Sequence, residues 1–81
     1  MPRLSRKDIL QDFRTRSLLE ATRRIIAAEG FDAITMERVA REAGITKGGI
    51  YLYFRNKDQM TFTALEGIAS EMLREIEMRI D

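Results

Sequence analysis

Residues 30–60 read GFDAITMERVAREAGITKGGIYLYFRNKDQM, and this stretch decides the fold. The helical spacing of its apolar residues predicts short helices at 36–43 and 47–54, separated by a turn at 44–46. Gly44 suits that turn because glycine adopts a left-handed backbone conformation at little cost. A short helix, a tight turn and a second short helix at this spacing predict a helix-turn-helix.

Polar side chains at the expected helix starts support these boundaries. Thr35 and Thr46 precede the two short helices, where a hydroxyl can accept a hydrogen bond from a free backbone N–H. Asn56 is the expected N-cap of a further helix, and Gln59 follows three residues later as in a capping-box variant. We therefore expect that helix to begin at about Lys57.

Apolar residues predict how the two short helices pack together. Ala40 lies four residues before Gly44, where a larger side chain would push the helices apart. Ile50 and Phe54 are four residues apart and are expected to anchor the segment 47–54 from inside. Other small helical hairpins share these features, which are therefore moderately specific.

Longer helices are predicted on both sides of this unit. One is expected from about Thr15 to Glu29, and upstream of it residues 5–13 either extend this helix or form a mobile basic arm. The other runs from about Lys57 to the end of the chain and carries a long apolar stripe of Met60, Ala64, Leu65, Ile68, Ala69, Met72, Leu73, Ile76 and Ile80. The predicted fold is all-α, a three-helix bundle with a homeodomain-like helix-turn-helix and the start of a fourth long helix.

The apolar stripe of the last helix is longer than three short helices can cover. We expect its distal half to pack on a further domain or on a partner chain. In the alternative, one face packs on the helix at 15–29 and the end of the last helix is frayed and amphipathic.

The composition excludes several classes of function. The 81 residues are 44% hydrophobic and 33% charged, which predicts one small folded domain. Cysteine and histidine are absent, so disulfides and the common metal sites are not expected, and neither is a cofactor. The chain has no apolar run of the roughly 20 residues that span a membrane. Its carboxylates lack a partnering nucleophile or base, so we do not expect an enzyme.

The net charge of +1 hides an uneven distribution. From Met1 to Lys57 there are twelve Lys and Arg against seven Asp and Glu, giving +5, whereas residues 58–81 carry −4. This pattern suits a chain whose first two thirds meet a polyanion. Chance segregation of charge on two solvated faces is an equal alternative from charge alone.

The exposed residues expected on the segment 47–54 favour a polyanion partner. Lys47, Tyr51 and Tyr53 surround the adjacent glycines Gly48 and Gly49. Each glycine costs a helix about 1 kcal/mol relative to alanine, whereas glycine lets the backbone approach a surface closely. Tyrosine hydroxyls and lysine ammonium groups can then reach phosphates. In the alternative, Tyr51 or Tyr53 is partly core and the glycines form a loop.

The sequence resembles the DNA-binding signature of the tetracycline-repressor (TetR) family from about Thr15 to the early part of the last helix. The matching elements are Thr15-Arg16, Leu18, Leu19, Ala21, Gly30-Phe31, Thr35-Met36, Val39, Ala43-Gly44-Ile45-Thr46, Gly48, Ile50-Tyr51, Tyr53-Phe54, Asn56-Lys57 and Met60. The resemblance implies a regulator, most simply a repressor, that binds palindromic double-stranded operator DNA as a dimer.

The resemblance also implies roles for individual residues. Thr35 matches a position at a phosphate-contacting helix N-terminus, and Lys47 begins the recognition helix that enters the major groove. Tyr51 and Tyr53 match aromatic positions that contact the DNA backbone and sometimes thymine methyl groups. Lys57 matches a lysine that binds phosphate from the first turn of the last helix.

One departure from the family pattern concerns sequence reading. Gly49 occupies a variable position that often supplies a base contact, and glycine has no side chain for this. Reading is then expected to depend on Thr46, Lys47, Tyr51 and Leu52, with help from the Arg-rich arm or from DNA shape.

A second departure concerns the rest of the chain. Family members usually continue into a helical domain that dimerises and binds a small-molecule inducer, whereas this sequence ends at Asp81. We therefore expect a basic arm or helix extension at 1–14, a helix-turn-helix domain at 15–57, and at 58–81 a helix leading to an absent C-terminal domain. The fragment is expected to be a cytoplasmic monomer or weak dimer, and the full-length protein a homodimer. The alternative function is a protein-interaction module that pairs through the apolar face of the last helix without binding DNA.

Overall fold

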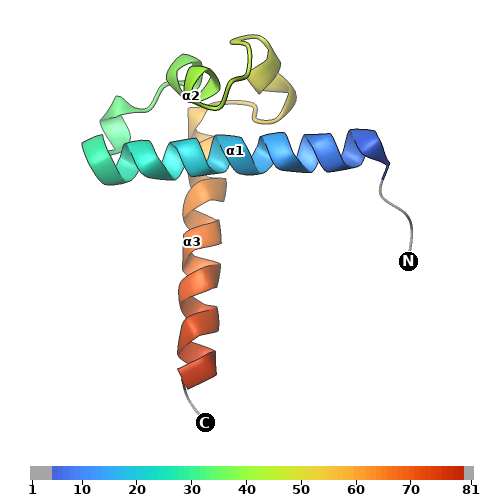
Figure 1. Cartoon of the computed structure of the whole chain (residues 1–81). Coiled ribbons are helices and arrows are strands. Elements are labelled where there is room, and N and C mark those ends of the chain that lie inside the picture. The colour runs from blue at the N-terminus through green and yellow to red at the C-terminus, as the bar shows by residue number, and fades with distance from the viewer. Residues whose placement is uncertain (1–4, 80–81) are drawn as a thin grey trace.

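The computed structural model describes residues 5–79, and within this range it contains helices and turns and no strand. The elements are α1 (Arg6–Glu29), the 3-10 helix η1 (Phe31–Ala33), α2 (Met36–Glu42), the 3-10 helix η2 (Gly49–Leu52) and α3 (Lys57–Arg79). α2 and η2 lie on one side of α1, and α3 crosses α1 and projects from its other side (Figure 1). The all-α prediction is confirmed.

α1 begins earlier than the helix predicted from Thr15. Ser5 is its N-cap and forms a capping box with Asp8, because each side chain bonds the backbone N–H of the other. Of the two arrangements left open for residues 5–13, the structure has the helix extension. The division of the chain into domains stays a prediction.

The predicted turn after α2 is present with its hydrogen bonds. Gly44 has a φ of 72°, in the left-handed region. The Ile45 N–H donates to the Ala40 carbonyl at 2.8 Å, and the Gly44 N–H donates to the Arg41 carbonyl at 3.2 Å. This is the bond pattern of a Schellman motif, which ends α2 and turns the chain toward η2.

The helix predicted at 47–54 is much shorter in the structure, and this prediction of its length was wrong. Only Gly49–Leu52 is helical, and it is a 3-10 helix. The Tyr51 and Tyr53 N–H groups bond carbonyls three residues back, on Gly48 and Ile50. Two adjacent glycines disfavour a regular α-helix, and a segment this short gains little from propagating one.

The core lies between α1, α2, η2 and the first turns of α3. Its buried members are Leu18, Ala21, Ile25, Ile34, Met36, Val39, Ala40, Ile50, Phe54 and Met60. The predicted anchors Ile50 and Phe54 and the predicted close contact at Ala40 are therefore confirmed as interior. This packing fixes α2 and η2 on α1 and leaves their outer sides in solvent.

The second half of α3 projects away from this core (Figure 1). Leu65, Met72 and Leu73 of the predicted apolar stripe are exposed, and Ile68 is half-buried. The side chain of Ile76 and all of Ile80 lie outside the described residues. No helix within residues 5–79 is long and apolar enough to cross a membrane.

Candidate nucleic-acid interface

The N-terminus of α2 presents Thr35 to solvent. The Thr35 hydroxyl accepts a hydrogen bond from the Arg38 N–H at 3.0 Å, which confirms Thr35 as the N-cap. Its side chain is exposed beside the first turn of α2. The structure therefore places Thr35 on the solvent side of the helix-turn-helix.

The turn and η2 place most of the predicted contact residues on the surface. Thr46, Lys47 and Gly48 are exposed, and Gly49 and Tyr53 are half-buried. Tyr51 and Leu52 expose 53% and 82% of their surface, although Ile50 beside them is fully buried. One short element thus carries an anchor inside and a set of polar, aromatic and apolar side chains outside.

Gly49 has a role within the fold that the sequence did not indicate. The Thr46 hydroxyl accepts the Gly49 N–H at 3.0 Å. A Cβ on Gly49 would lie 2.7 Å from that hydroxyl oxygen, whereas a Cβ on Gly48 would meet nothing within 4 Å. Gly49 therefore permits the hydrogen bond with Thr46, whereas the N-cap of η2 is Gly48, where a side chain would point into open space.

The two glycines give a matched pair of substitutions with opposite expected effects. Gly49→Ala displaces the Thr46 hydroxyl and should lower the free energy of unfolding by about 1 kcal/mol, as for a lost N-cap. Gly48→Ala should raise it by about 0.4–1 kcal/mol, because the φ of −73° at Gly48 suits alanine. Urea denaturation of both variants measures the two values. Equal effects would contradict this account of Gly49.

Lys47 lies close to an acid on α2. Its Nζ is 3.5 Å from Glu37 Oε2, and both side chains are largely exposed. Exposed ion pairs of this kind contribute about 0–1 kcal/mol. Lys47 thus lies near the start of α2, and its ion pair with Glu37 is weak enough for another anion to replace the Glu37 carboxylate.

Lys57 is positioned by an aromatic ring that sequence reasoning did not connect with it. Its Nζ lies 4.2 Å from the centroid of the Phe31 ring, which is a cation–π contact. Phe31 opens η1, just before the loop that leads to Thr35. The contact between Phe31 and Lys57 is tertiary, because the two residues are 26 positions apart in the sequence.

Arg14 was also missed as an individual residue of the site. Its Nη1 donates to the Tyr53 hydroxyl at 3.4 Å. This contact joins the early part of α1 to the end of η2, 39 residues further along the chain. The alternative that one of the two tyrosines is partly core is confirmed for Tyr53, which packs against the core, whereas Tyr51 is exposed.

An ion network holds α2 against the end of α1. The Arg38 guanidinium bonds Glu29 of α1 and also lies 3.5 Å from Glu42 of its own helix. The hydrogen bond from Arg38 lowers the pKa of Glu29 below its ordinary value of 4.5. The network therefore supports the orientation of α2 at neutral pH and weakens as Glu29 is protonated in acid.

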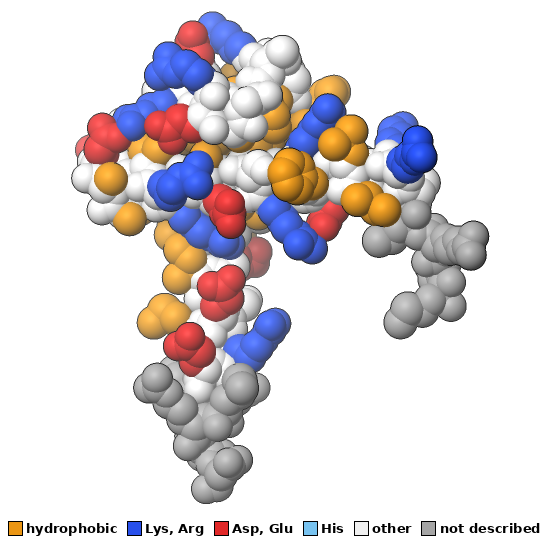
Figure 2. Space-filling view, in the orientation of Figure 1, with side chains coloured by type: hydrophobic (Ala, Val, Ile, Leu, Met, Phe, Trp, Pro, Cys, Tyr) orange, Lys and Arg blue, Asp and Glu red, His pale blue; other side chains and the backbone are white. Residues whose placement is uncertain are grey.

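The charges differ between the two parts of the molecule. The part formed by α1, α2 and η2 carries many Lys and Arg side chains, whereas the visible charges along α3 are mostly acidic (Figure 2). The uneven distribution seen in the sequence is thus also a division in space.

Comparisons with known proteins give a consistent result. Residues 18–64 match the family model described as bacterial regulatory proteins, tetR family. The chain is 34% identical over 67 residues to an uncharacterized HTH-type transcriptional regulator, YfiR, of Bacillus subtilis, a match that covers 83% of this chain and 33% of the relative. It is 33% identical over 72 residues to the HTH-type transcriptional regulator BetI of Escherichia coli, covering 89% and 35%.

A third similar protein is an HTH-type transcriptional repressor of Mycobacterium tuberculosis, 34% identical over 62 residues, with 76% of this chain and 32% of the relative covered. The chain spans about a third of the length of these curated relatives. No solved structure matches it.

Proposed function

The chain belongs to the tetR family of bacterial regulatory proteins, and from this premise we propose that it binds operator DNA and places η2 in the major groove. The proposal makes the chain the reading part of a transcriptional regulator. The 81 residues match only about a third of the length of the relatives named above, and the proposed DNA reading is assigned to this matched region.

One observation carries the proposal: η2 packs into the core with one side chain and exposes the neighbouring side chains to solvent. Ile50 is fully buried, whereas Tyr51 and Leu52 next to it are exposed. Together, Tyr51 and Leu52 place a hydroxyl and an apolar group side by side on the solvent side of a glycine-rich turn. Such side chains are suited to a groove where a hydroxyl meets phosphate and an apolar group meets a thymine methyl.

The residues divide by the contact we propose for each. Lys47 and Lys57 bind phosphates and supply the affinity that depends on salt. Thr35 and Tyr53 bind the DNA backbone with their hydroxyls. Base reading falls to Thr46, Lys47, Tyr51 and Leu52, and Gly48 and Gly49 allow the backbone of the turn to approach the groove closely.

For the full-length regulator we propose a homodimeric repressor. The exposed apolar residues Leu65, Met72 and Leu73 give α3 a face that can continue into a dimerising part. An inducer would act there and change the separation of two DNA-reading units. A regulator of this kind works in the cytoplasm, where the bacterial chromosome lies.

Selection of bound duplexes from a random-sequence pool tests the proposed function. The 81-residue chain should enrich one half-site, and Tyr51→Ala should reduce the enrichment at individual base pairs within it. Arg74→Ala, a change on the projecting part of α3, should leave the selected half-site unchanged. Recovery of unrelated sequences by the parent chain would contradict specific reading.

Glu37 should oppose DNA binding by competing for Lys47. The Glu37→Gln substitution removes the carboxylate 3.5 Å from the Lys47 ammonium, so duplex affinity should rise about two- to fivefold, the range of an exposed ion pair. Fluorescence anisotropy with a labelled duplex measures the change. Glu75→Gln on α3 removes the same charge far from Lys47 and should have little effect. If Glu37→Gln weakens binding, Glu37 makes a favourable contact with DNA instead.

A further inference from the structure

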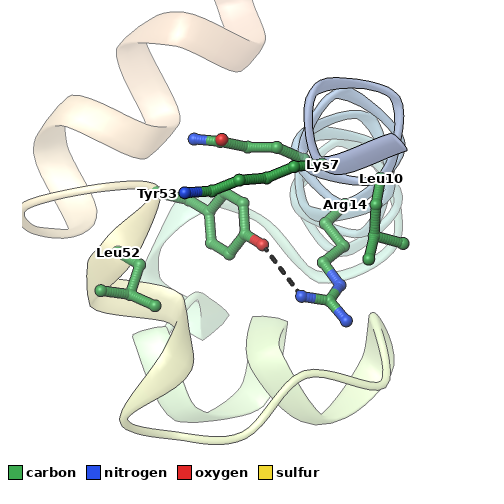
Figure 3. A pocket seen from close by; sticks show the side chains of 6 residues that line it. Lys7, Leu10, Arg14, Leu52 and Tyr53 are labelled. Atoms are coloured by element: carbon green, nitrogen blue, oxygen red, sulfur yellow. Dashed lines mark hydrogen bonds between the residues drawn. The ribbon is translucent and has the colours of Figure 1, made fainter. Parts of the chain in front are cut away.

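The first turns of α1 lie beside η2 and enclose a groove with it. The groove has a volume of about 410 Å³ and is lined by Lys7, Leu10, Gln11, Arg14, Leu52 and Tyr53 (Figure 3). The family match begins only at residue 18, so the α1 side of this groove is formed outside the matched region. The groove is thus a feature of this chain that the helix-turn-helix does not explain.

The α1 wall of the groove is cationic. Lys7, Gln11 and Arg14 are spaced by four and three residues, which places them on one face of α1. Figure 3 shows Lys7 and Arg14 reaching toward Tyr53 from this face. Among residues 5–75, whose side chains the structure describes, neither Lys7 nor Arg14 forms a salt bridge, and no carboxylate lines the groove.

The acids of the same helical turns are engaged elsewhere. Asp8 is bonded to Ser5 in the capping box at the start of α1. Asp12 forms a salt bridge of 2.9 Å with Arg16, one turn further along the helix. The positive charge that faces the groove is therefore not neutralised from its own helix.

The groove continues into the recognition region. A second hollow of about 290 Å³ shares Arg14, Leu52 and Tyr53 with it and extends to Gly49 and the turn at 44–46. The Arg14 guanidinium bonds the Tyr53 hydroxyl with one N–H, and a guanidinium has further donors. A polyanion that contacts η2 and passes along Tyr53 would meet Arg14 and then Lys7.

We propose that Lys7 and Arg14 bind the phosphate backbone of the same duplex that η2 reads, as a second phosphate contact outside the helix-turn-helix. This inference rests on the proposed function. Leu10 supplies apolar surface in the groove, against which a deoxyribose can pack. The helix extension then widens the DNA footprint beyond Tyr53.

The test is a salt titration of binding between the 81-residue chain and a random-sequence duplex. In the Lys7→Gln, Arg14→Gln variant, the slope of log affinity against log salt should become less steep by about 1.8, because each lost phosphate contact removes roughly 0.9 from its magnitude. The Arg16→Gln, Arg24→Gln variant removes the same charge from parts of α1 that do not line the groove, and its slope should match the parent's. Lys7→Gln alone breaks no hydrogen bond among the described residues, and it should reduce the magnitude of the slope by about 0.9, the contribution of one phosphate contact.

The Tyr53→Phe variant distinguishes two roles for Arg14: binding a phosphate directly, or only holding η2 in place through the Tyr53 hydroxyl. It removes the hydroxyl that Arg14 bonds and keeps both cations, so the slope should stay at the parent's value. A slope that falls equally in Tyr53→Phe and in the double variant would overturn the proposal, because Arg14 would then act only through η2.

Two further results separate this inference from the proposed function. If the double variant keeps the parent's slope while loss of Lys47 and Lys57 lowers it, the inference fails and the proposed function stands. If the folded parent chain does not bind duplex DNA at low salt, the proposed function fails and the inference fails with it.

Discussion

Ile50→Ala is expected to lower the free energy of unfolding by about 2–5 kcal/mol, the usual effect of truncating a fully buried isoleucine. Ile50 is fully buried and belongs to the same core cluster as Leu18, Val39 and Met60. A chain of 81 residues has a total stability of only about 4–12 kcal/mol at typical values per residue. The variant should therefore lose a large part of its stability, together with the anchor that orients η2.

Leu52→Ala is the matched control for Ile50→Ala. Leu52 lies in the same 3-10 helix but is 82% exposed, so its truncation should change stability by no more than about 0.5 kcal/mol. Thermal unfolding followed by circular dichroism measures both variants, and the Ile50→Ala midpoint should fall by more than about 10 °C. Similar midpoints for the two variants would contradict the assignment of inner and outer sides to η2.

Removing Lys47 and Lys57 together is expected to have the largest effect on DNA binding. Each lysine that neutralises a phosphate releases counterions, so its loss should weaken binding on the order of tenfold at 0.1 M salt and lower the salt slope by about 0.9. The Lys47→Ala, Lys57→Ala variant should therefore bind about a hundredfold more weakly to all duplex sequences. Its fold should persist, because Lys47 is exposed and the Phe31 contact of Lys57 is at the surface.

Arg74→Ala provides the control for that variant. Arg74 is an exposed cation on the projecting part of α3, so its loss should leave the salt slope unchanged. Phe31→Leu adds a second comparison, because it keeps apolar bulk but removes the ring over Lys57. Its effect should fall between those of the parent and Lys57→Ala. An unchanged salt slope in the double lysine variant would show that other residues bind the phosphates.

Local signals in the sequence predicted much of this fold. The Thr35 cap, the hydrogen bond from the Gly49 N–H to the Thr46 hydroxyl and the left-handed Gly44 turn follow from side-chain and backbone chemistry within three or four residues. The burial of Ile50 and Phe54 follows from their spacing. These features were predictable because each depends on neighbours along the chain.

The sequence did not reveal contacts that depend on tertiary packing. The bond between Arg14 and Tyr53 and the contact between Phe31 and Lys57 join residues that are 39 and 26 positions apart. The 3-10 geometry of η2 was also missed, because apolar spacing alone does not distinguish a short α-helix from a tighter turn. The contact roles of the surface residues stay predictions, since a free surface does not identify its ligand.

Binding of the unmodified 81-residue chain to random-sequence duplex DNA, followed by fluorescence anisotropy over a range of salt concentrations, tests the central claim most directly. Light scattering on the same sample gives the mass of the protein. The account predicts binding at low salt, with log affinity falling linearly against log salt and a slope of about −1.8 or steeper, since at least two lysines contact phosphate. A folded chain that does not bind at low salt and that pairs through α3 would contradict the account and favour a protein-interaction module.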